Sequence, residues 1–283
     1  MFDLQGHRGA RGLFPENTLE GFAAALALGV RSFELDIGVT RDGVPVVHHD
    51  PALNPDVTRD LGGDWLEGRG PLLRDLNLAD LAEFDVGRIR PGTAYAAIYA
   101  TQVPRDGARI PTLDAVLRLH RSARFNIELK LLPDHPDWTV SAEEMADRVL
   151  HVIDQTGAAN RVTIQSFDWR APRHVARARP DIPRGWLTRA ETIGAASLWR
   201  GDPSASTSID AVPDAVAAEG GGTWTSFHTE LTPSLLERGH RLGLKVIPWT
   251  VNDPADMRRL IGWGVDGLIT DWPDRAPADH CRA

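Results

Sequence analysis

Two histidines and two carboxylates near the N-terminus have the types and spacing to do chemistry. His7 stands in GHRG, Glu34 and Asp36 in ELD, and His49 in VVHHD, each within a short apolar run typical of a strand. Because a strand alternates its faces, Glu34 and Asp36 project from the same side. Two carboxylates held side by side repel each other unless a cation or a shared proton neutralises them. The adjoining sequence offers little Lys or Arg, so a bound metal ion is the simplest interpretation.

Length and charge bound the class of protein. The chain has 283 residues with 42% hydrophobic content, enough to bury a large core as one big domain or two small ones. Its formal net charge of −8 argues against non-specific binding to nucleic acid or to an anionic membrane surface. We therefore expect no nucleic-acid partner and no stable membrane association.

The cysteine content and the hydropathy indicate the compartment. Cys281 is the one cysteine, so no disulfide framework forms within the chain. The N-terminal residues show no secretory signal, and no apolar stretch approaches the roughly 18 residues that span a bilayer. We expect a soluble, cytoplasmic protein; the sequence leaves its oligomeric state open.

Strand and helix patterns alternate along most of the chain, which predicts βα units and a parallel sheet. Nine candidate strands are found, one more than an eight-stranded barrel needs, so one of the closely spaced second and third must be irregular or a hairpin partner. The strands are expected at 2–7, 32–40, 44–49, 125–131, 161–167, 185–187, 223–227, 244–249 and 267–270. Helices are expected from Asn17 to Gly29, with Asn17 as cap and Glu20 reaching back, and at 112–122, 141–156, 169–178, 232–242 and 254–263.

Residues 51–111 interrupt this alternation. The segment is dense in Gly, Pro, Asp and Arg, with one expected short helix at 78–84. A connection of this length without regular structure is often a functional loop or lid, although a plain surface excursion explains it equally well.

Six motifs follow one another along the chain and together resemble the glycerophosphodiester phosphodiesterase family. They are HRGARGLFPENT, ELDIGVTRDGVPVVHHD, NIELK, IQSFD, WTVN and DGLITDWPD. The resemblance covers nearly the whole chain, from His7 to Pro273. It implies an α/β fold, a (β/α)8 TIM barrel forming one domain over residues 1–283, with a small inserted segment after the strand that carries His49. That insertion coincides with residues 51–111, and barrels of this kind place their chemistry at the carboxyl ends of their strands.

The resemblance also assigns a metal site. Glu34, Asp36 and Glu128 would bind one divalent cation through oxygen atoms only. Such a set suits a hard ion, Mg²⁺ or Ca²⁺, whereas zinc prefers nitrogen or sulfur. Glu128 taken by itself is also explained by a local pair with Lys130.

By the same resemblance, His7 and His49 would be the general acid and base. An imidazole titrates near neutral pH and can exchange a proton at either end of a phosphodiester displacement. His48 is the rival to His49, because alternation puts the two on opposite faces. The family pattern places its histidine directly before Asp50, which favours His49.

Further roles follow for residues around these. Arg8 would grip the phosphate through its planar guanidinium, and Lys130 would complement the phosphate or orient a ligand carboxylate. Glu16 is expected to brace the metal site or His7 from behind. Asn17 is expected behind the site or in the pocket, although a role as helix cap explains it without catalysis, and Trp249 either lines the pocket or packs in the barrel. The rim of the barrel is expected to be shaped by Gln165, Ser166 and Asp271.

The resemblance implies metal-assisted hydrolysis of glycerophosphodiesters to sn-glycerol 3-phosphate and an alcohol, with the glycerol 2-hydroxyl as a nucleophile and a cyclic phosphate intermediate. One alternative is a lysophospholipase D, with an apolar groove formed by Trp65, Leu66, Tyr95 and Tyr99. Another is a sugar-phosphate isomerase or aldolase, which needs a Gly-rich phosphate loop that DGLITDWPD does not supply. A non-catalytic phosphodiester-binding barrel predicts loss of the histidines and carboxylates, and all of them are present.

Overall fold

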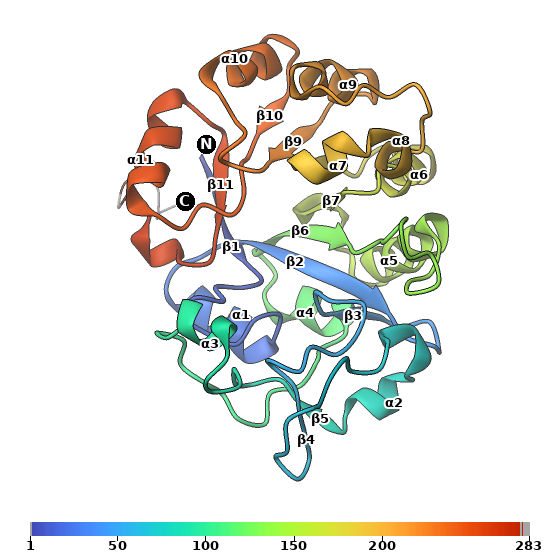
Figure 1. The fold of residues 1–283 in the computed structure, drawn as a ribbon, viewed down its shortest axis with the longest axis vertical. Helices are drawn as coiled ribbons and strands as arrows, with labels where there is room; N and C mark the ends of the chain where they lie inside the picture. Colours follow the sequence, from blue (N-terminus) through green and yellow to red (C-terminus); the bar gives the residue numbers. More distant parts are fainter. Residues whose placement is uncertain (1, 278, 280–283) are drawn as a thin grey trace.

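Eight parallel strands form a barrel in the computed structural model, which describes residues 2–277 and 279 (Figure 1). Each strand pairs with the next around the ring, in the order β10-β9-β8-β7-β6-β2-β1-β11. Their bounds are β1 (Asp3–His7), β2 (Ser32–Val39), β6 (Arg124–Leu129), β7 (Val162–Ser166), β8 (Arg184–Thr188), β9 (Thr223–Ser226), β10 (Lys245–Val246) and β11 (Gly267–Thr270). The predicted α/β barrel is confirmed. Cys281 lies outside the described residues.

The ring is nearly closed between β10 and β11. Backbone hydrogen bonds cross this gap: the Asp266 N–H donates to Val246 O and the Ile269 N–H to Pro248 O, each at 3.0 Å, and the Val251 N–H donates to Ile269 O at 2.9 Å. A proline has no N–H to donate, so the strand predicted over 244–249 is reduced to two residues and Trp249 follows it.

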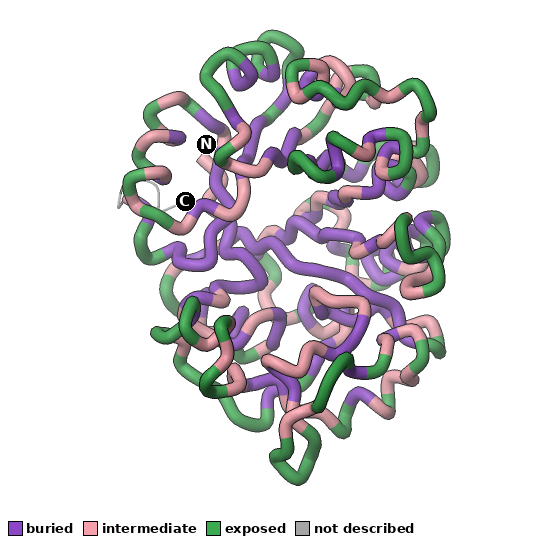
Figure 2. The backbone as a smooth tube through the Cα atoms, in the orientation of Figure 1, coloured by how far each residue is buried: buried purple, intermediate pink, exposed green. Residues whose placement is uncertain are grey.

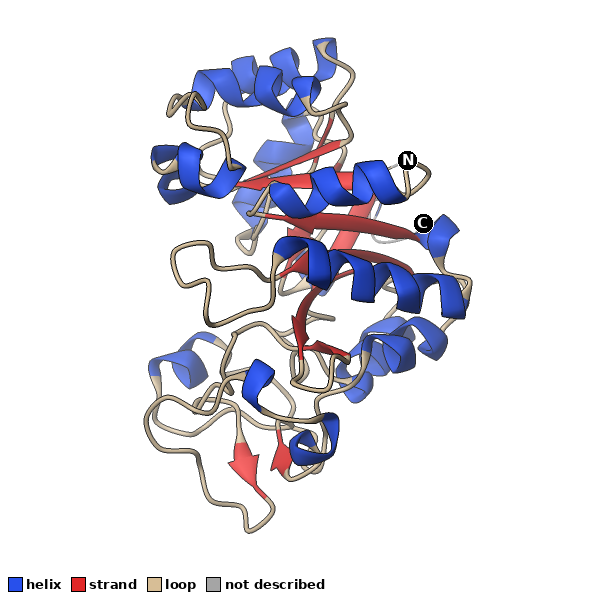
Figure 3. Cartoon of the chain, turned by 90° about the vertical axis from the view of Figure 1, so that its right-hand side faces the viewer, coloured by secondary structure: helices blue, strands red, loops and turns tan. Residues whose placement is uncertain are grey.

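Helices cover the outside of the barrel (Figure 3). They are α1 (Leu19–Ala27), α4 (Leu113–Leu119), α5 (Ala142–Thr156), α6 (Arg170–Ala178), α7 (Ala190–Gly194), α8 (Ala196–Arg200), α9 (Val212–Ala218), α10 (Pro233–Arg241) and α11 (Pro254–Trp263), with 3-10 turns η2 (Ala159–Arg161), η3 (Ile209–Ala211) and η4 (Pro273–Arg275). The sequence analysis missed α7, α8 and α9 between β8 and β9, where short helices leave little periodic signal.

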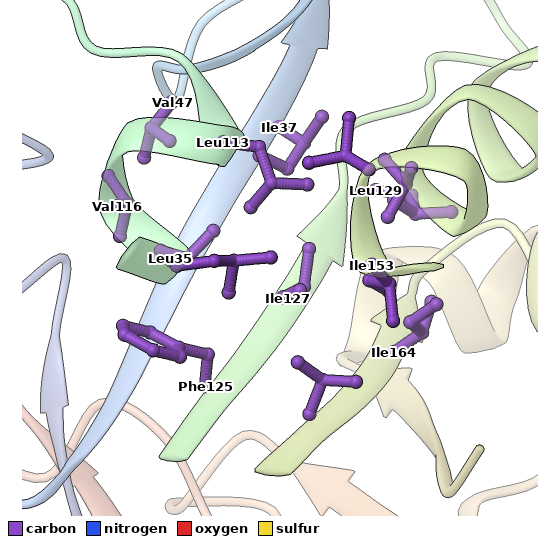
Figure 4. Close-up of a cluster of buried hydrophobic side chains, with 14 of the residues drawn as sticks. Leu35, Ile37, Val47, Leu113, Val116, Phe125, Ile127, Leu129, Ile153 and Ile164 are labelled. Atoms are coloured by element: carbon purple, nitrogen blue, oxygen red, sulfur yellow. The ribbon is translucent and has the colours of Figure 1, made fainter. Parts of the chain in front are cut away.

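Alternate residues of the strands face these helices. Leu35, Ile37 and Ile127 point outward and are fully buried against Leu113 of α4 and Ile153 of α5 (Figure 4). Because successive side chains of a strand point to opposite faces, the residues between them must point to the barrel interior. The hydrophobic packing of β2 and β6 thus fixes the direction of their polar side chains.

The second and third candidate strands form a hairpin, which is one of the two possibilities predicted for the extra strand, the other being an irregular strand. β3 (Pro45–Val47) runs antiparallel to β2, with Val47 opposite Ile37, and it is not part of the ring. The chain therefore returns toward the barrel after Gly43, and the His48 N–H donates to Asp36 O at 3.0 Å. His49 thus reaches the carboxylates through this antiparallel return, not from the end of a barrel strand.

Residues 51–111 lie beside the barrel below β3 (Figure 1), and together with Val46 of β3 they form a small core separate from that of the barrel. The short elements are β4 (Arg59–Asp60), η1 (Leu73–Asp75), α2 (Leu78–Leu81), β5 (Phe84–Asp85) and α3 (Ala94–Ile98). Buried residues of this core are Val46, Leu53, Leu73, Leu81, Val86 and Ile110. The tip that joins β4 to the following segment is exposed (Figure 2), and the single helix expected at 78–84 is α2, which ends at Leu81.

The predicted cap of α1 is wrong. The helix begins at Leu19, and Thr18 is its N-cap, because the Thr18 hydroxyl accepts from Gly21 N. Asn17 precedes the cap with a positive φ of 54°. Its side-chain amide turns to Asp36 instead. No helix in the described part of the chain is long and apolar enough to cross a membrane.

Candidate active site

The pairing register of three strands gathers the acidic residues at one end of the barrel. Glu34 of β2 lies beside His7 of β1, and Asp36 of β2 lies beside Glu128 of β6. All three carboxylates are buried, and one oxygen of each lies within 4.8 Å of the others. A purely local pattern on two strands therefore becomes a three-carboxylate cluster through the register.

Two cations lie against this cluster: the sequence analysis named the pair of Lys130 with Glu128, but not the contact of Arg8 with Asp36. Arg8 Nε is 3.2 Å from Asp36 Oδ2. Lys130 Nζ is 2.7 Å from Glu128 Oε1 and 3.6 Å from Asp36 Oδ1. The expectation of little compensating charge is wrong, because the barrel brings in positive side chains from two other strand ends.

The two cations affect the pKa values of the three carboxyl groups unequally. Burial, then repulsion from Asp36 and Glu128, raises the pKa of Glu34 well above its ordinary value. Burial also raises the pKa of Glu128, against the pull of Lys130. For Asp36 burial acts in the same direction, but Arg8, His49 and Lys130 outweigh it and lower the pKa well below its ordinary value. Positive charge is therefore in deficit at Glu34.

The cluster fits a hard divalent cation. Within the described residues, Glu34 Oε2 and Asp36 Oδ1 are buried and have no hydrogen-bond partner. A buried carboxylate oxygen left unpaired is costly, and a cation bound by oxygen atoms would remove that cost. Asn17 Nδ2 donates to Asp36 Oδ2 at 2.9 Å, which directs the other oxygen, Oδ1, toward the cluster.

His7 is held between two acidic side chains. Its Nδ1 lies 2.6 Å from Asp271 Oδ1, and its Nε2 lies 3.6 Å from Glu34 Oε2. Asp271 accepts a hydrogen bond from the Nδ1–H, which assigns the tautomer in which Nε2 is free to accept a proton. Burial, then the charge of Arg11, lowers the pKa of His7 to about 4, although Asp271 acts in the opposite direction.

Of the two adjacent histidines, His49 lines the cavity beside the carboxylates. Its Nδ1 lies 2.7 Å from Asp50 Oδ1, so it too has a carboxylate behind the ring. Burial, then Arg8 and Lys130, lowers the pKa of His49 well below its ordinary value. His48 is not among the lining residues in the described structure; it is buried with Nε2 3.3 Å from Ala52 O.

Glu16 lies behind Arg8. The Arg8 guanidinium donates to Glu16 Oε1 at 2.8 Å, and Glu16 and Asp36 outweigh the opposing effect of burial to raise the pKa of Arg8 well above its ordinary value. Glu16 thus bonds the side chain that is predicted to bind the phosphate, and no hydrogen bond or ion pair joins it to the carboxylate cluster or to His7 in the described structure.

Glu34 and Glu128 of the acidic cluster, His7, His49 and Arg8 line one cavity of about 390 Å³, and Asp36 is buried behind them. Trp249 lines it, and its indole N–H donates to Thr225 O at 3.1 Å. Other apolar residues of the wall are Leu131, Leu132, Phe167, Leu187 and Trp199. The four residues expected to form an apolar groove are not among its lining in the described structure: Trp65 lies by Arg59, and Tyr95 and Tyr99 bond carboxylates behind the cavity.

Sequence reasoning missed the role of Asp271. It was expected only to shape the rim with Gln165 and Ser166, yet it is fully buried and accepts hydrogen bonds from His7, Arg11, Tyr99 and Asn252. An aspartate directly after an apolar strand was the available signal, but its partners come from distant segments. Gln165 lines the cavity, whereas Ser166 is buried and donates to Leu129 O.

Comparison with known proteins adds independent information. The model of the glycerophosphoryl diester phosphodiesterase family matches residues 7–275. A proposed glycerophosphoryl diester phosphodiesterase of Silicibacter pomeroyi DSS-3 has a similar crystal structure, with a TM-score of 0.87, 36% identity, and coverage of 97% of this chain and 91% of that one. A glycerophosphodiester phosphodiesterase of Caldanaerobacter subterraneus subsp. tengcongensis is 30% identical over 95% of this chain and 93% of its own.

A further likeness concerns the fold. A phosphodiesterase of Oleispira antarctica, in complex with the product sn-glycerol-3-phosphate, superposes with a TM-score of 0.72 at 23% identity. The match covers 96% of this chain and 94% of that one. The barrel and its arrangement of helices are therefore shared with proteins of much lower sequence similarity.

Proposed function

The chain belongs to the glycerophosphoryl diester phosphodiesterase family and is a phosphoric diester hydrolase acting on glycerophosphodiesters; from this premise we propose how its residues do the work. His7 and His49 move the protons, Arg8 and Lys130 hold the phosphate, and the acidic cluster binds one divalent cation. The products are sn-glycerol 3-phosphate and an alcohol. The bound product of the Oleispira antarctica phosphodiesterase is of this kind.

The two imidazoles divide the proton transfers. Both line the cavity, and in each a carboxylate holds Nδ1, Asp271 for His7 and Asp50 for His49, which leaves Nε2 for the proton transfer. One neutral imidazole accepts the proton of the attacking hydroxyl, and the other, once protonated, donates to the leaving oxygen. The lowered pKa of both makes each a neutral base at rest. The phosphate's negative charge, placed against Arg8 and Lys130, favours protonation of the donor.

Phosphate binding falls to the cationic side chains. Arg8 is already fixed by Glu16 and Asp36, so little rotamer freedom is lost when its guanidinium meets a phosphate oxygen. Lys130 adds a point charge from the end of β6, on the other side of β2. A divalent cation on Glu34, Asp36 and Glu128 would supply charge neutralisation at a phosphate oxygen and activate an oxygen nucleophile. Mg²⁺ and Ca²⁺ both suit oxygen ligands of this kind.

One observation carries the proposal: Glu34 and Glu128 line the same cavity as two carboxylate-held imidazoles, and they belong to a cluster in which Glu34 Oε2 and Asp36 Oδ1 have no hydrogen-bond partner among the described residues. The test is hydrolysis of a glycerophosphodiester panel by the purified protein in EDTA and after Mg²⁺ or Ca²⁺ is restored. We expect release of sn-glycerol 3-phosphate only with the cation. Full turnover in EDTA would refute the assignment of the metal site.

The apolar wall of the cavity favours a second substrate class, lysophospholipids. Phe167 packs against Trp249 at 5.4 Å and against Trp199 at 6.2 Å between ring centroids, which gives an apolar surface next to the polar centre. An acyl chain or an uncharged part of the alcohol would bury this surface. Turnover of glycerophosphocholine against its acylated form separates the two substrates: faster cleavage of the acylated form assigns lysophospholipase D activity.

A further inference from the structure

The loop that joins β1 to α1 carries Arg8 and Glu16 and is strained at both ends. Arg8 has a φ of 51° and Asn17 a φ of 54°, both in the left-handed region that non-glycine residues rarely adopt. The Asn17 N–H donates to Arg8 O at 3.0 Å, which joins the two ends of the loop. Both side chains contact Asp36. Strained backbone persists only where surrounding contacts hold it, so contacts from other segments must hold this loop in its conformation.

Residues 94–103, which we call the α3 segment, supply many of them. Three carbonyls in succession accept from it: Arg11 O from the Gln102 amide at 2.7 Å, Gly12 O from the Thr101 hydroxyl at 3.0 Å and Leu13 O from Val103 N at 2.8 Å. The loop is also close to β11, since a Cβ on Gly12 would lie 2.3 Å from the Trp272 ring. The β1–α1 loop is therefore fixed by a segment outside the barrel.

The same segment contains both tyrosines of the chain, Tyr95 and Tyr99. The Tyr95 hydroxyl donates to Glu16 Oε2, whose other oxygen holds Arg8. The Tyr99 hydroxyl donates to Asp271 Oδ2 at 3.1 Å, whose other oxygen holds His7. Each tyrosine therefore shares a carboxylate with one residue of the active site.

Arg11 joins the two arrangements. Its Nε donates to Asp271 Oδ1 at 2.6 Å and its Nη1 to the Tyr95 hydroxyl at 3.3 Å, while its guanidinium carbon lies 4.9 Å from the Tyr99 ring centre. The two tyrosine rings are 4.8 Å apart at their centroids. Phenylalanine would preserve this packing, so the hydroxyls need a separate explanation.

We propose that Tyr95 and Tyr99 are positioning residues of the active site. Tyr95 acts on Arg8 through their shared carboxylate and so sets phosphate binding. Tyr99 acts on His7 through a second carboxylate and so sets proton transfer. A carboxylate bonded on both oxygens is fixed in rotation, and it fixes the side chain on the other side.

This inference rests on the proposed function. It adds a role for residues 51–111, which we propose to be an insertion in the barrel. The barrel supplies the carboxylate cluster, and the α3 segment sets the orientation of two residues that meet the substrate. Phosphate binding and proton transfer then depend on separate hydroxyl groups only four residues apart. Their loss must affect different kinetic constants.

The test compares Tyr95→Phe with Tyr99→Phe on glycerophosphodiester hydrolysis with the restored cation. Tyr95→Phe should raise KM about three- to tenfold and leave kcat within about twofold, because Arg8 loses its orientation. Tyr99→Phe should lower kcat by a similar factor and leave KM within about twofold. Thr156→Val removes a hydroxyl on the last turn of α5, remote from the cavity, and should change neither constant.

Two kinetic outcomes overturn the proposal. In one, both phenylalanine variants match the unchanged protein in kcat and KM. In the other, kcat falls and KM rises together in both variants, in proportion to a fall in Tm, as a merely structural role would produce. If the unchanged protein hydrolyses no glycerophosphodiester with either cation, the proposed function itself fails.

A readout without activity keeps the two failures apart. Because the chain has two tyrosines, the ultraviolet absorbance of tyrosinate reports on Tyr95 and Tyr99 alone. Burial, then Glu16 for Tyr95 and Asp271 for Tyr99, raises the pKa of both phenols. Asp271→Asn should lower the pH at which Tyr99 ionises, measured in the Tyr95→Phe background. Ordinary ionisation of both tyrosines in the folded, unchanged protein would overturn the proposal whatever its activity.

Discussion

Asp271 Oδ1 lies 2.6 Å from His7 Nδ1, although 264 positions separate them in the chain. The contact exists because the first and last strands of the barrel are neighbours, with Gly6 beside Thr270 in the register. Asp271 is fully buried, and although burial raises the pKa of its carboxyl, His7 and then Arg11 outweigh burial and hold that pKa well below its ordinary range. An ionised carboxylate is therefore always present behind His7.

Asp271→Asn should lower kcat by about 10- to 100-fold, because the amide no longer fixes the tautomer of His7. KM should change less, since Asp271 does not line the cavity in the described structure. Steady-state kinetics at saturating cation measures both. Asp147→Asn is the matched control: it breaks an exposed His–Asp pair of the same 2.6 Å length, with His174, and should leave kcat unchanged. Equal losses in the two variants would contradict the role of Asp271.

His49→Ala and His48→Ala should separate catalysis from stability. His49→Ala removes a cavity imidazole and should lower kcat by on the order of 100-fold or more. His48→Ala removes the buried contact with Ala52 and should cost about 1–2 kcal/mol of unfolding free energy with little loss of kcat. Kinetics and urea unfolding of both variants provide the measurement. Undiminished turnover of His49→Ala would refute the proposed proton transfers.

Removal and return of the cation should change stability as well as activity. The cluster repels itself without a cation, and a ligand that binds only the folded state stabilises it by about 2.7 kcal/mol at 100 times its Kd. We expect Tm to rise as Mg²⁺ or Ca²⁺ is added after EDTA. Glu34→Gln should weaken this rise, whereas Glu143→Gln, on the exposed first turn of α5, should not. A Tm that is independent of both cations would contradict the site.

His7 should make the folded state sensitive to acid. Its pKa is lowered to about 4 in the folded protein, first by burial and then by Arg11, while the unfolded chain keeps a value near 6.5. Between these values the unfolded state binds more protons, so the free energy of unfolding falls as the pH falls, by on the order of 3 kcal/mol. The loss is complete below about pH 4, and stability is fully present above about pH 6.5.

Urea unfolding of the unchanged protein and of His7→Gln, in EDTA from pH 4 to pH 7, measures this effect. The difference between their unfolding free energies should shrink or reverse toward acid pH, because the variant has no imidazole to protonate. A difference that stays constant across this range would show that the His7 imidazole is not held neutral by its surroundings.

Much of the architecture was predictable because it depends on local pattern. The alternation of apolar strands and amphipathic helices predicted βα units and a parallel sheet, and the family resemblance implied the barrel. One strand too many left two possibilities, an irregular strand or a hairpin partner, and β3 forms a hairpin with β2. Short helices were missed where a few residues give no periodicity, as in α3 and in α7 to α9. The cap of α1 was assigned to Asn17 instead of Thr18 because two cap-forming residues stand side by side, and the choice depends on a tertiary contact with Asp36.

The sequence by itself determined which side chains face inward, because strand alternation ties Glu34 and Asp36 to the face opposite Leu35 and Ile37. It also determined the family, through motifs that keep their order along the chain. Only the tertiary structure decided which charges meet. Strand register joined Asp36 to Glu128, and barrel closure joined His7 to Asp271. The α3 segment brought Tyr95 to Glu16 and Tyr99 to Asp271. Such contacts join residues far apart in the chain, and no local pattern specifies them.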